Sequence, residues 1–388
     1  MLAKEIIKKF NSRFAQYPIV VRSPTRINLI GEHTDYNDGF VLPAAIDKAI
    51  FVAIQKREDE NIILHSEEFN ETVEFTPHSS LIISHSKHWS NYILGVVFQL
   101  KNQGYKITGF NLLVAGNIPV GAGLSSSAAL ECATVFALNE LFNLWISKIE
   151  MVKIAQQTEH EFVGVKCGIM DQFSNMFGKK NNLILLDCRS LEHKYIPVKL
   201  EENKIVLFDT QVKHSLANSE YNLRREQCEE GVLILKNSYP KIKNLRDVTI
   251  EMLAKIPTDT QHSALIFNRC KYIIEENERL IAGTNNLLKG DILNFGKKMF
   301  ITHFGLSNLY EVSCVELDFL VDFVKNENAV YGARMHGGGF GGCTINIINE
   351  SVLDDLSDRI KQSYYDKFNR ELKIYDVSLE DGTSVVVQ

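Results

Sequence analysis

The stretch from residue 116 to residue 130, GNIPVGAGLSSSAAL, carries most of the information about the fold. It follows an apolar segment at 110–115 that is typical of a buried strand, and it precedes an apolar helix expected at about 128–144. Glycines let backbone N–H groups approach a ligand, and serines at a helix start cap the helix or reach a ligand. The open N–H groups and the helix dipole favour a phosphate there. The loop therefore predicts either a phosphate site or a tight, serine-capped turn.

This loop differs from the Walker A loop of P-loop nucleotide-binding proteins. In that motif a Gly-Lys-Ser/Thr sequence closes the loop, whereas here Gly116 and Gly121 are followed by Ala122 and Gly123. The phosphate hypothesis therefore depends on the glycines, the serines and the helix start alone.

Two carboxylates follow the apolar helix in QQTEHEFVGVKCGIMDQFSN, at Glu159 and Asp171. A carboxylate near a phosphate loop can hold Mg²⁺, a cation that prefers oxygen ligands. A second carboxylate can orient a substrate hydroxyl or accept its proton. The alternative is a solvated helix face followed by an aspartate at a helix cap.

Residues 26–40, RINLIGEHTDYNDGF, begin as an apolar strand and end in a dense polar loop. A polyhydroxylated ligand requires carboxylates, imidazole and amide groups together, because each hydroxyl both donates and accepts hydrogen bonds. The alternative is a surface turn, since Asn37-Asp38-Gly39 is itself turn chemistry.

A glycine cluster near the C-terminus, HGGGFGGC, satisfies the G-x-G-x-x-G pattern of nicotinamide-binding proteins at Gly337, Gly339 and Gly342. The context contradicts that function, because a strand-like CTINII follows the glycines where a dinucleotide site requires a helix. The cluster is better interpreted as a turn between two strands that packs near a ligand.

Bulk composition limits the class of protein. The 388 residues are 45% hydrophobic and 23% charged, with a net charge of -6, which is an ordinary globular mix with no indication of a nucleic-acid partner. No apolar run approaches the roughly 18 residues that span a bilayer, and no signal peptide is apparent. Seven widely spaced cysteines without C-x-x-C predict reduced thiols and a cytoplasmic location. The oligomeric state stays open, and a monomer is compatible with these features.

The chain is long enough for roughly two or three domains. We expect an N-terminal α/β domain at 1–200 and a C-terminal α/β domain at 201–388. The expected strands are 17–21, 26–30, 51–55, 62–65, 110–115 and 205–208, with the first two separated by a break at Ser23-Pro24. The expected helices are 91–102, 128–144, 219–236 and most of 265–330.

The motifs together resemble the galactokinase family of the GHMP small-molecule kinase superfamily. The stretches that carry the resemblance cover nearly the whole chain: RINLIGEHTDYNDGFVLPAAI (26–46), PVGAGLSSSAAL (119–130), CGIMDQF (167–173), KHSLANSEYNLRREQCEE (213–230) and GARMHGGGFGGC (332–343). The resemblance implies an α/β (α+β) fold with two lobes and an active site in the cleft between them. It also implies transfer of the γ-phosphate of ATP to the anomeric hydroxyl of D-galactose, with Mg²⁺ as cofactor.

The resemblance also assigns roles to single positions. It places Arg26 and Asp171 at the reacting hydroxyl as catalytic residues. It assigns sugar binding to Glu32, His33, Asp35, Gly168 and Tyr221. It assigns Mg²⁺ binding to Ser127 and Glu159. It assigns ATP binding to Gly121, Ala122, Gly123, Leu124, Ser125, Ser126 and Ser127, with Trp89 and Tyr92 near the adenine.

One position departs from the family pattern, and other functions stay open. The family usually has Pro-Gly before the arginine, whereas this chain has Pro24-Thr25, and a β-branched threonine must avoid positive φ. A kinase for N-acetylgalactosamine or arabinose is one alternative, although Thr34–Gly39 resembles galactose-specific members. A non-catalytic sugar sensor is another alternative, and the intact Ser125–Ala129 and Asp171 argue against it.

Overall fold

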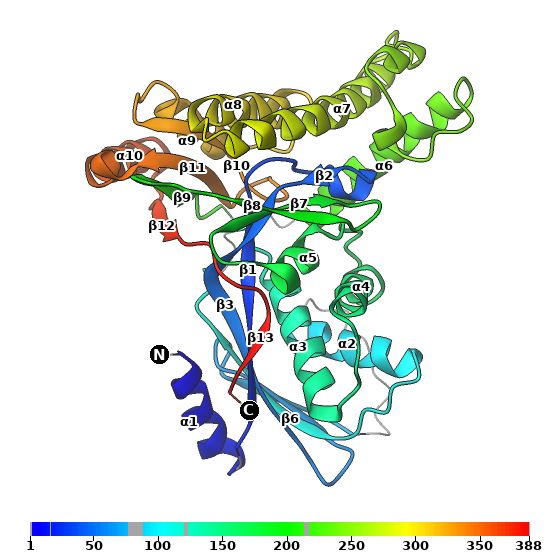
Figure 1. Ribbon diagram of the computed structural model, residues 1–388, viewed down its shortest axis with the longest axis vertical. Coiled ribbons are helices and arrows are strands. Elements are labelled where there is room, and N and C mark those ends of the chain that lie inside the picture. The colour runs from blue at the N-terminus through cyan, green and yellow to red at the C-terminus, as the bar shows by residue number, and fades with distance from the viewer. Residues whose placement is uncertain (1, 16, 77–87, 120–122, 213–216, 388) are drawn as a thin grey trace.

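The computed structural model describes residues 2–15, 17–76, 88–119, 123–212 and 217–387. The chain forms a mixed α/β structure with three sheets and a long helical layer at one end (Figure 1). The strand orders are β13-β1-β3-β6-β4-β5 in the first sheet, β10-β11-β9-β12 in the second and β2-β7-β8 in the third. This arrangement agrees with the predicted α/β class.

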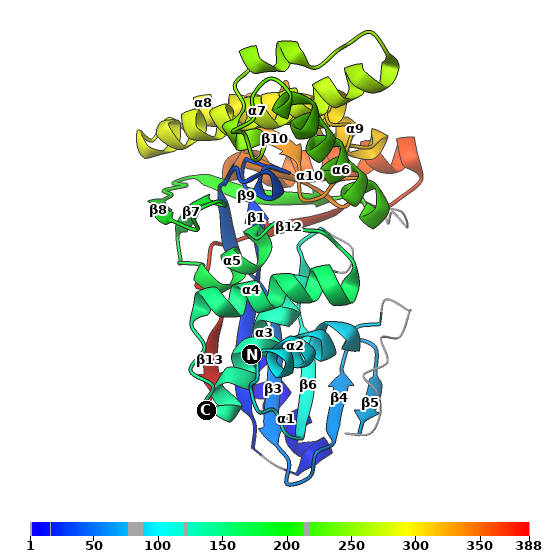
Figure 2. The same ribbon diagram turned by 90° about the vertical axis from the view of Figure 1, so that its right-hand side faces the viewer.

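The six-stranded sheet has helices on both faces (Figures 1 and 2). Its strands are β1 (Ile19–Asn28), β3 (Pro43–Lys56), β4 (Ile62–Ser66), β5 (Glu71–Phe75), β6 (Phe110–Gly116) and β13 (Ser384–Val387). The larger apolar core joins one face to α2 (Ser90–Asn102), α3 (Ser126–Phe142), α4 (Lys148–Thr158) and α5 (Met170–Phe177). On the other face, α1 (Leu2–Phe14) packs its buried Ile6 and Phe10 against β1, β3 and β6.

The predicted break at Ser23-Pro24 is wrong, because β1 continues through both residues. A proline lacks the N–H that a central strand must donate, and it is therefore confined to sheet edges and bulges. Here β13 pairs only with residues 20–22 of β1, so Pro24 lies beyond that neighbour. On the other side the register with β3 shifts between Pro24 and Arg26, as in a β-bulge.

The second sheet separates two apolar cores. It consists of β9 (Asn203–Asp209), β10 (Val330–Met335), β11 (Cys343–Asn349) and β12 (Lys373–Val377). Successive residues of a strand point to opposite faces. Ile205 and Leu207 accordingly pack toward α7 (Gln261–Leu288) and α8 (Ile292–Asn308). Val206 and Phe208 pack toward α9 (Val315–Val324) and α10 (Leu353–Phe368).

The third sheet lies between the other two (Figure 1). Its strands are β2 (Phe40–Val41), β7 (Asn182–Asp187) and β8 (His193–Pro197). The helix α6 (Ala217–Lys236) packs against α7 through a core that includes Cys228, Leu235 and Cys270. Short helical turns lie at Asp35–Asn37, Glu159–Val163, Leu245–Asp247, Glu251–Lys255 and Glu350–Val352.

The cysteines and the helices agree with the properties expected from composition. All seven cysteines are free thiols in the structure. Among the described residues, no helix is both long enough and apolar enough to cross a bilayer.

Candidate active site

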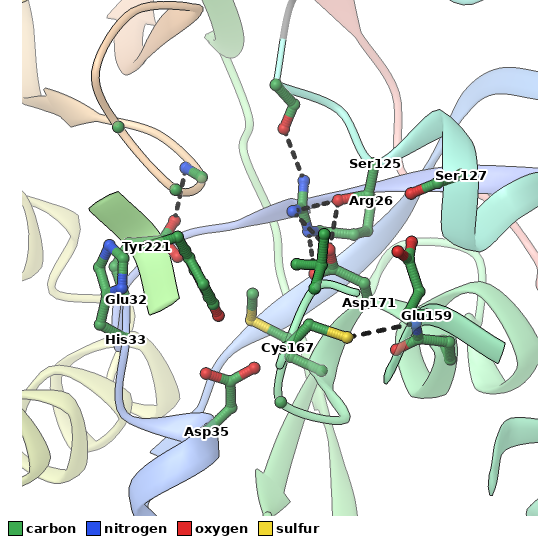
Figure 3. Close-up of a pocket in the computed structure, with 18 of the residues that line it drawn as sticks. Arg26, Glu32, His33, Asp35, Ser125, Ser127, Glu159, Cys167, Asp171 and Tyr221 are labelled. Atoms are coloured by element: carbon green, nitrogen blue, oxygen red, sulfur yellow. Dashed lines mark hydrogen bonds and ion pairs between the residues drawn. The ribbon is translucent and has the colours of Figure 1, made fainter. Parts of the chain in front are cut away.

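A cavity of about 280 Å³ lies where the first sheet, its helices and the glycine turn after β10 meet (Figure 3). Its walls come from both sides of residue 200, so it occupies the predicted cleft. Most of the predicted site residues line it: Arg26, Glu32, His33, Asp35, Tyr92, Gly123, Ser125, Ser127, Glu159, Gly168, Asp171 and Tyr221. Gly121, Ala122 and residues 213–216 of the predicted motifs lie outside the described residues.

Arg26 and Asp171 form a two-point ion pair in the centre of this cavity (Figure 3). Arg26 Nε donates to Asp171 Oδ1 at 2.6 Å, and Arg26 Nη2 donates to Oδ2 at 2.9 Å. Such a paired geometry fixes both position and orientation of a carboxylate. Burial acts to lower the pKa of Arg26, but the charge and hydrogen bonds of Asp171 together with the charges of Glu32 and Asp35 outweigh it, and the pKa is raised. Arg26 therefore keeps its positive charge although its side chain is almost fully buried.

The helix start of α3 contacts the same ion pair. Ser125, the N-cap residue of α3, accepts a hydrogen bond from Arg26 Nη2 at 2.5 Å and donates one to Asp171 Oδ2. Arg26 Nη1 donates to the carbonyl of Gly123 at 3.0 Å. The Ser125 side chain makes no capping hydrogen bond to α3, because its hydroxyl is bonded to Arg26 and Asp171, so the expected serine cap is not formed by this residue. The phosphate site stays a prediction.

The bulge in β1 aims Arg26 at this helix start. Thr25 is fully buried, and its hydroxyl donates to the carbonyl of Lys48 at 3.1 Å across the bulge. It is not among the residues with positive φ, so the β-branched side chain is accommodated without backbone strain. The departure from the family pattern therefore leaves the geometry beside Arg26 regular.

Ser127 and Glu159 lie together at the other side of Asp171 (Figure 3). Glu159 begins a π-helical turn after α4 and is only 6% exposed. Burial raises the pKa of Glu159 to about 7, although a hydrogen bond with Ser127 acts in the opposite direction. A carboxylate and a hydroxyl are hard oxygen donors that suit Mg²⁺. Nowhere in the described ranges do three His, Cys, Asp or Glu side chains come together in a cluster that could hold a metal ion.

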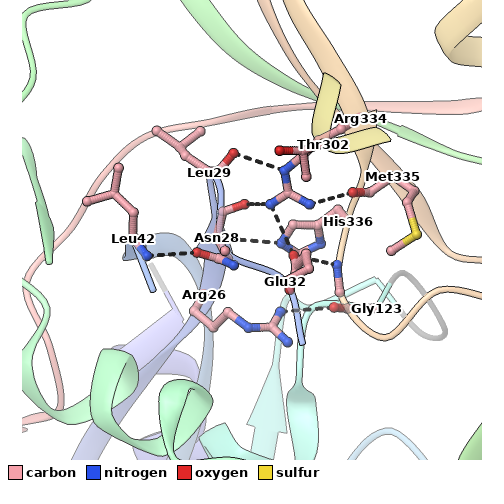
Figure 4. A network of polar contacts seen from close by, with 12 residues as sticks. Arg26, Asn28, Leu29, Glu32, Leu42, Gly123, Thr302, Arg334, Met335 and His336 are labelled. Atoms are coloured by element: carbon pink, nitrogen blue, oxygen red, sulfur yellow. Dashed lines mark hydrogen bonds and ion pairs between the residues drawn. The ribbon is translucent and has the colours of Figure 1, made fainter. Parts of the chain in front are cut away.

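Glu32 is held at the far wall by the glycine turn (Figure 4). Its Oε1 accepts hydrogen bonds from Gly337 N at 2.9 Å and from Arg334 Nη2 at 3.0 Å. Arg334 is fully buried and also donates to the backbone carbonyls of Leu29 and Met335. The buried charges of Glu32 and Arg334 therefore compensate each other and connect the loop after β1 to the turn after β10.

His33 lies in an aromatic cluster beside Glu32. Its ring is 5.3 Å from the ring of Tyr221 and 5.8 Å from that of Tyr36, and its Nδ1 shares a 2.8 Å hydrogen bond with the hydroxyl of Tyr36. Burial, reinforced by the cations Arg224 and Arg334, lowers the pKa of His33 to about 3. The imidazole is therefore neutral at physiological pH.

Asp35 approaches Gly168 so closely that only glycine fits there. A Cβ at position 168 would lie 2.0 Å from Asp35 Oδ2. Burial, together with the charges of Asp171 and Glu32, raises the pKa of Asp35 to about 7. Within the described part of the chain, no basic side chain forms an ion pair with Asp35, so its oxygens face the cavity with hydrogen-bonding capacity to spare.

A second, more apolar cavity of about 200 Å³ adjoins the first. Tyr92 and Ser127 line both cavities, while Trp89 and Ser126 line only the second. Its other walls include Ile50, Phe69, Val114, Ile118 and Leu130. Leu124 lines neither cavity, because its buried side chain packs in the core with residues of the second sheet.

Comparisons with known proteins identify the family. Three family models match: the galactokinase galactose-binding signature at residues 8–56, the GHMP kinases N terminal domain at 91–179 and the GHMP kinases C terminal model at 285–366. The curated galactokinase of Thermotoga neapolitana is 43% identical over 366 residues, which cover 94% of this chain and 99% of that protein. That of Fusobacterium nucleatum is 41% identical over 99% of this chain and 100% of its own length. The chain belongs to the galactokinase family.

Solved structures agree with this galactokinase assignment. The crystal structure of Lactococcus lactis galactokinase complexed with galactose covers all of both chains, with a TM-score of 0.94 and 33% identity. Methanococcus jannaschii mevalonate kinase matches 94% of this chain with a TM-score of 0.65 and 18% identity, which shows the shared fold alone. The predicted family and the predicted two-lobed GHMP kinase fold are both confirmed.

The galactokinase cavity also contains residues that sequence reasoning missed. Gln172 and Cys167 line it directly, and Arg334 supports Glu32 from behind. One signal existed for Arg334: it is a charged residue inside the apolar strand VYGARM, which indicates a buried, paired cation. The glycine turn after β10 lies between two strands, so the nicotinamide alternative fails on the fold as expected.

Proposed function

We propose that this chain transfers the γ-phosphate of ATP to the anomeric C1 hydroxyl of D-galactose, giving galactose 1-phosphate and ADP, the first committed step of galactose catabolism. The observation that carries the proposal is the position of the Arg26–Asp171 pair. It lies between the sugar-side residues Glu32, His33, Asp35 and Tyr221 and the phosphate-side residues Ser125, Ser127 and Glu159 (Figure 3). A sugar hydroxyl and a phosphate bound on the two sides would meet at this pair.

On the sugar side, Asp35 accepts hydrogen bonds from the 3- and 4-hydroxyls, and Glu32 and His33 bind the end that carries the 6-hydroxyl. Because Gly168 has no Cβ, the Asp35 carboxylate can lie directly against its backbone, and the ring of Tyr221 forms an aromatic wall of the site. The neutral His33 can both donate and accept, as a hydroxyl requires.

On the phosphate side, the backbone from Gly121 to Ser127, including Leu124, surrounds the ATP phosphates at the start of α3. Phosphates favour this position because of the helix dipole and the open N–H groups. The adenine occupies the adjoining apolar cavity, where Trp89 and Tyr92 supply aromatic walls. The two cavities meet at Ser127, which lines both.

Ser127 and Glu159 would hold Mg²⁺, with ATP oxygens and water as the other ligands. This set fits the ion because Glu159 is a carboxylate whose pKa is raised by burial, so a bound cation would favour its charged form. Bound there, the ion would offset charge on the β- and γ-phosphates.

The transfer itself requires positioning more than covalent catalysis. The C1 oxygen attacks the γ-phosphorus while its proton passes to Asp171, and the bond from that phosphorus to the β–γ bridging oxygen breaks to release ADP. Arg26 fixes the orientation of Asp171 and offsets charge on the transferring group. Ser125 contacts both residues and keeps them at the helix start.

Product identification tests this function. Purified protein with ATP, Mg²⁺ and galactose should form ADP and a phosphate ester whose ³¹P signal couples to the anomeric proton. An ester at C6, or no ADP above the sugar-free control, would contradict the proposal.

The proposal also includes a cellular location and a division of the chain into two domains. We place the enzyme in the cytoplasm, supported by seven unpaired cysteines. We keep domains at 1–200 and 201–388, with residues 384–387 returning to pair with β1 in the first sheet.

A further inference from the structure

The loop between β1 and β2, residues 29–39, contains the proposed sugar-binding residues Glu32, His33 and Asp35, and three of its residues have positive φ, two of them not glycine. Gly31 has a φ of 93°, His33 of 64° and Asp38 of 57°. Left-handed conformations are uncommon for residues with a side chain, and they persist only where the surroundings fix them. Within the loop, the Thr34 side chain donates to the carbonyls of Gly31 and Phe40. Hydrogen bonds from outside the loop also fix its backbone.

One face of α7 supplies that support at the start of the loop. Tyr272 and Glu276 lie on the same face of α7, because residues four apart are neighbours on a helix. The hydroxyl of Tyr272 donates to the carbonyl of Glu32 at 3.1 Å, and Glu276 Oε1 accepts from Gly31 N at 2.8 Å. Both side chains are fully buried.

The packing around Gly31 confirms how closely the loop is seated. A Cβ at Gly31 would lie 2.4 Å from Leu280 Cδ1, one helical turn beyond Glu276. Glu276 itself is fixed by Arg279 and by Thr302 of α8, whose hydroxyl donates at 2.9 Å. The acceptor for Gly31 N therefore has little freedom to move.

Asn277 supports the end of the loop. Its Oδ1 accepts from Phe40 N at 2.8 Å, and its Nδ2 donates to the carbonyl of Ile273 in its own helix at 3.0 Å. Gly39 lies against the same Oδ1, which a Cβ would approach to 2.5 Å. Both ends of the loop are thus bonded to one helix, far away in sequence, which crosses over β2 (Figure 1).

We propose that Tyr272, Glu276 and Asn277 of α7 are positioning residues for the sugar site. They fix the backbone of residues 31, 32 and 40, and so set the affinity for the sugar without touching it. This inference rests on the proposed function, because it assigns the loop to the sugar and not to ATP.

Kinetics of two variants test the inference. Tyr272→Phe removes one hydroxyl and keeps the ring, and Asn277→Ala removes the acceptor for Phe40 N. Each loses one hydrogen bond to the loop, so KM for galactose should rise roughly 3- to 10-fold while KM for ATP stays unchanged.

Thr284→Ala is the matched control. Thr284 is also buried on α7, but its hydroxyl donates only to the carbonyl of Leu280 in the same helix. It should lower thermal stability without changing either KM. Equal changes of the two KM values in Tyr272→Phe and Asn277→Ala, or no change at all, would overturn the inference. If wild-type protein phosphorylates a different sugar, the proposed function fails, and the same variants assayed with that sugar still decide the role of α7.

Discussion

The proposed sugar side and the proposed phosphate side of the cavity differ in the groups to which their side chains are hydrogen-bonded. On the sugar side, Glu32 and His33 are bonded to groups that take no part in the reaction, including Arg334, Gly337 and Tyr36. On the proposed phosphate side, Ser125 is bonded to Arg26 and Asp171, the pair that lies between the two sides. The proposed sugar side is thus held by groups outside the reaction, whereas Ser125 on the proposed phosphate side is held by the central pair.

This difference indicates where specificity and rate arise. A fixed set of donors and acceptors can reject a sugar whose hydroxyl points in the wrong direction, because buried polar groups would then lack partners. Charged groups that compensate each other in the free protein keep a buried site stable until phosphate charge replaces one partner. Changes on the sugar side should therefore act on the sugar, and changes on the phosphate side on turnover.

The largest effect should come from Asp171→Asn. The amide keeps the size of the side chain but accepts no proton, so kcat should fall by roughly 10²-fold or more. Circular dichroism and galactose binding provide the controls and should show a folded protein that still binds the sugar, while the melting temperature should fall because Arg26 loses its charged partner. A folded Asp171→Asn variant with near-normal turnover would show that Asp171 does not accept the proton, and would contradict the central role given to the Arg26–Asp171 pair.

Asp35→Ala should act on the sugar side alone. Losing hydrogen bonds to a charged group should reduce kcat/KM for galactose by roughly 10- to 100-fold. The dissociation constant for ATP, measured by calorimetry, should be unchanged because Asp35 does not line the adenine cavity. A parallel loss of ATP affinity would mean that the two sides are not separable.

Glu159→Gln should act on the phosphate side through the metal. One anionic oxygen is lost, so the Mg²⁺ concentration for half-maximal rate should rise roughly 10-fold at saturating galactose. Glu161→Gln is the matched control, because Glu161 lies on the same π-helical turn with its side chain exposed. Identical Mg²⁺ titrations for the wild type and Glu159→Gln would place the metal on other residues.

A smaller effect should appear in stability, through Asp35→Asn. The pKa of Asp35 is raised from 3.8 to about 7, so the folded protein binds this proton more tightly than the unfolded chain. Its contribution to stability therefore falls as pH rises from about 4 to about 7 and is level above that. Asn cannot ionise and avoids this loss, which is at most about 4 kcal/mol at about 1.4 kcal/mol per pKa unit. The melting temperature of the variant should exceed that of wild type more at pH 8 than at pH 5, and an equal difference at both would contradict the raised pKa.

Sequence reasoning predicted the catalytic side of this comparison better than its supports. Arg26, Ser127, Glu159 and Asp171 lie in short motifs that resemble those of a known family, and the structure brings them into one cavity. The proline at position 24 predicts two separate strands where the structure has one, from Ile19 to Asn28. A strand tolerates a proline where its neighbouring strand has ended. Here that neighbour is β13, the last strand of the chain, which the local sequence around Pro24 does not reveal.

The supports on α7 had no local signal. Tyr272, Glu276 and Asn277 are ordinary residues of an amphipathic helix, and their role depends on a loop that precedes them by more than two hundred positions. Their importance follows only from the fold, which seats both ends of the sugar loop on that helix.

Comparison of sugars tests the account most directly. Values of kcat/KM for wild-type protein should be measured with galactose, glucose and N-acetylgalactosamine at saturating ATP and Mg²⁺. Glucose differs from galactose only at the 4-hydroxyl, which Asp35 is proposed to bind. Galactose should be used efficiently, glucose roughly 10⁴-fold less well, and N-acetylgalactosamine very little. A kcat/KM for glucose or N-acetylgalactosamine that equals or exceeds that for galactose would contradict the proposed sugar side of the site.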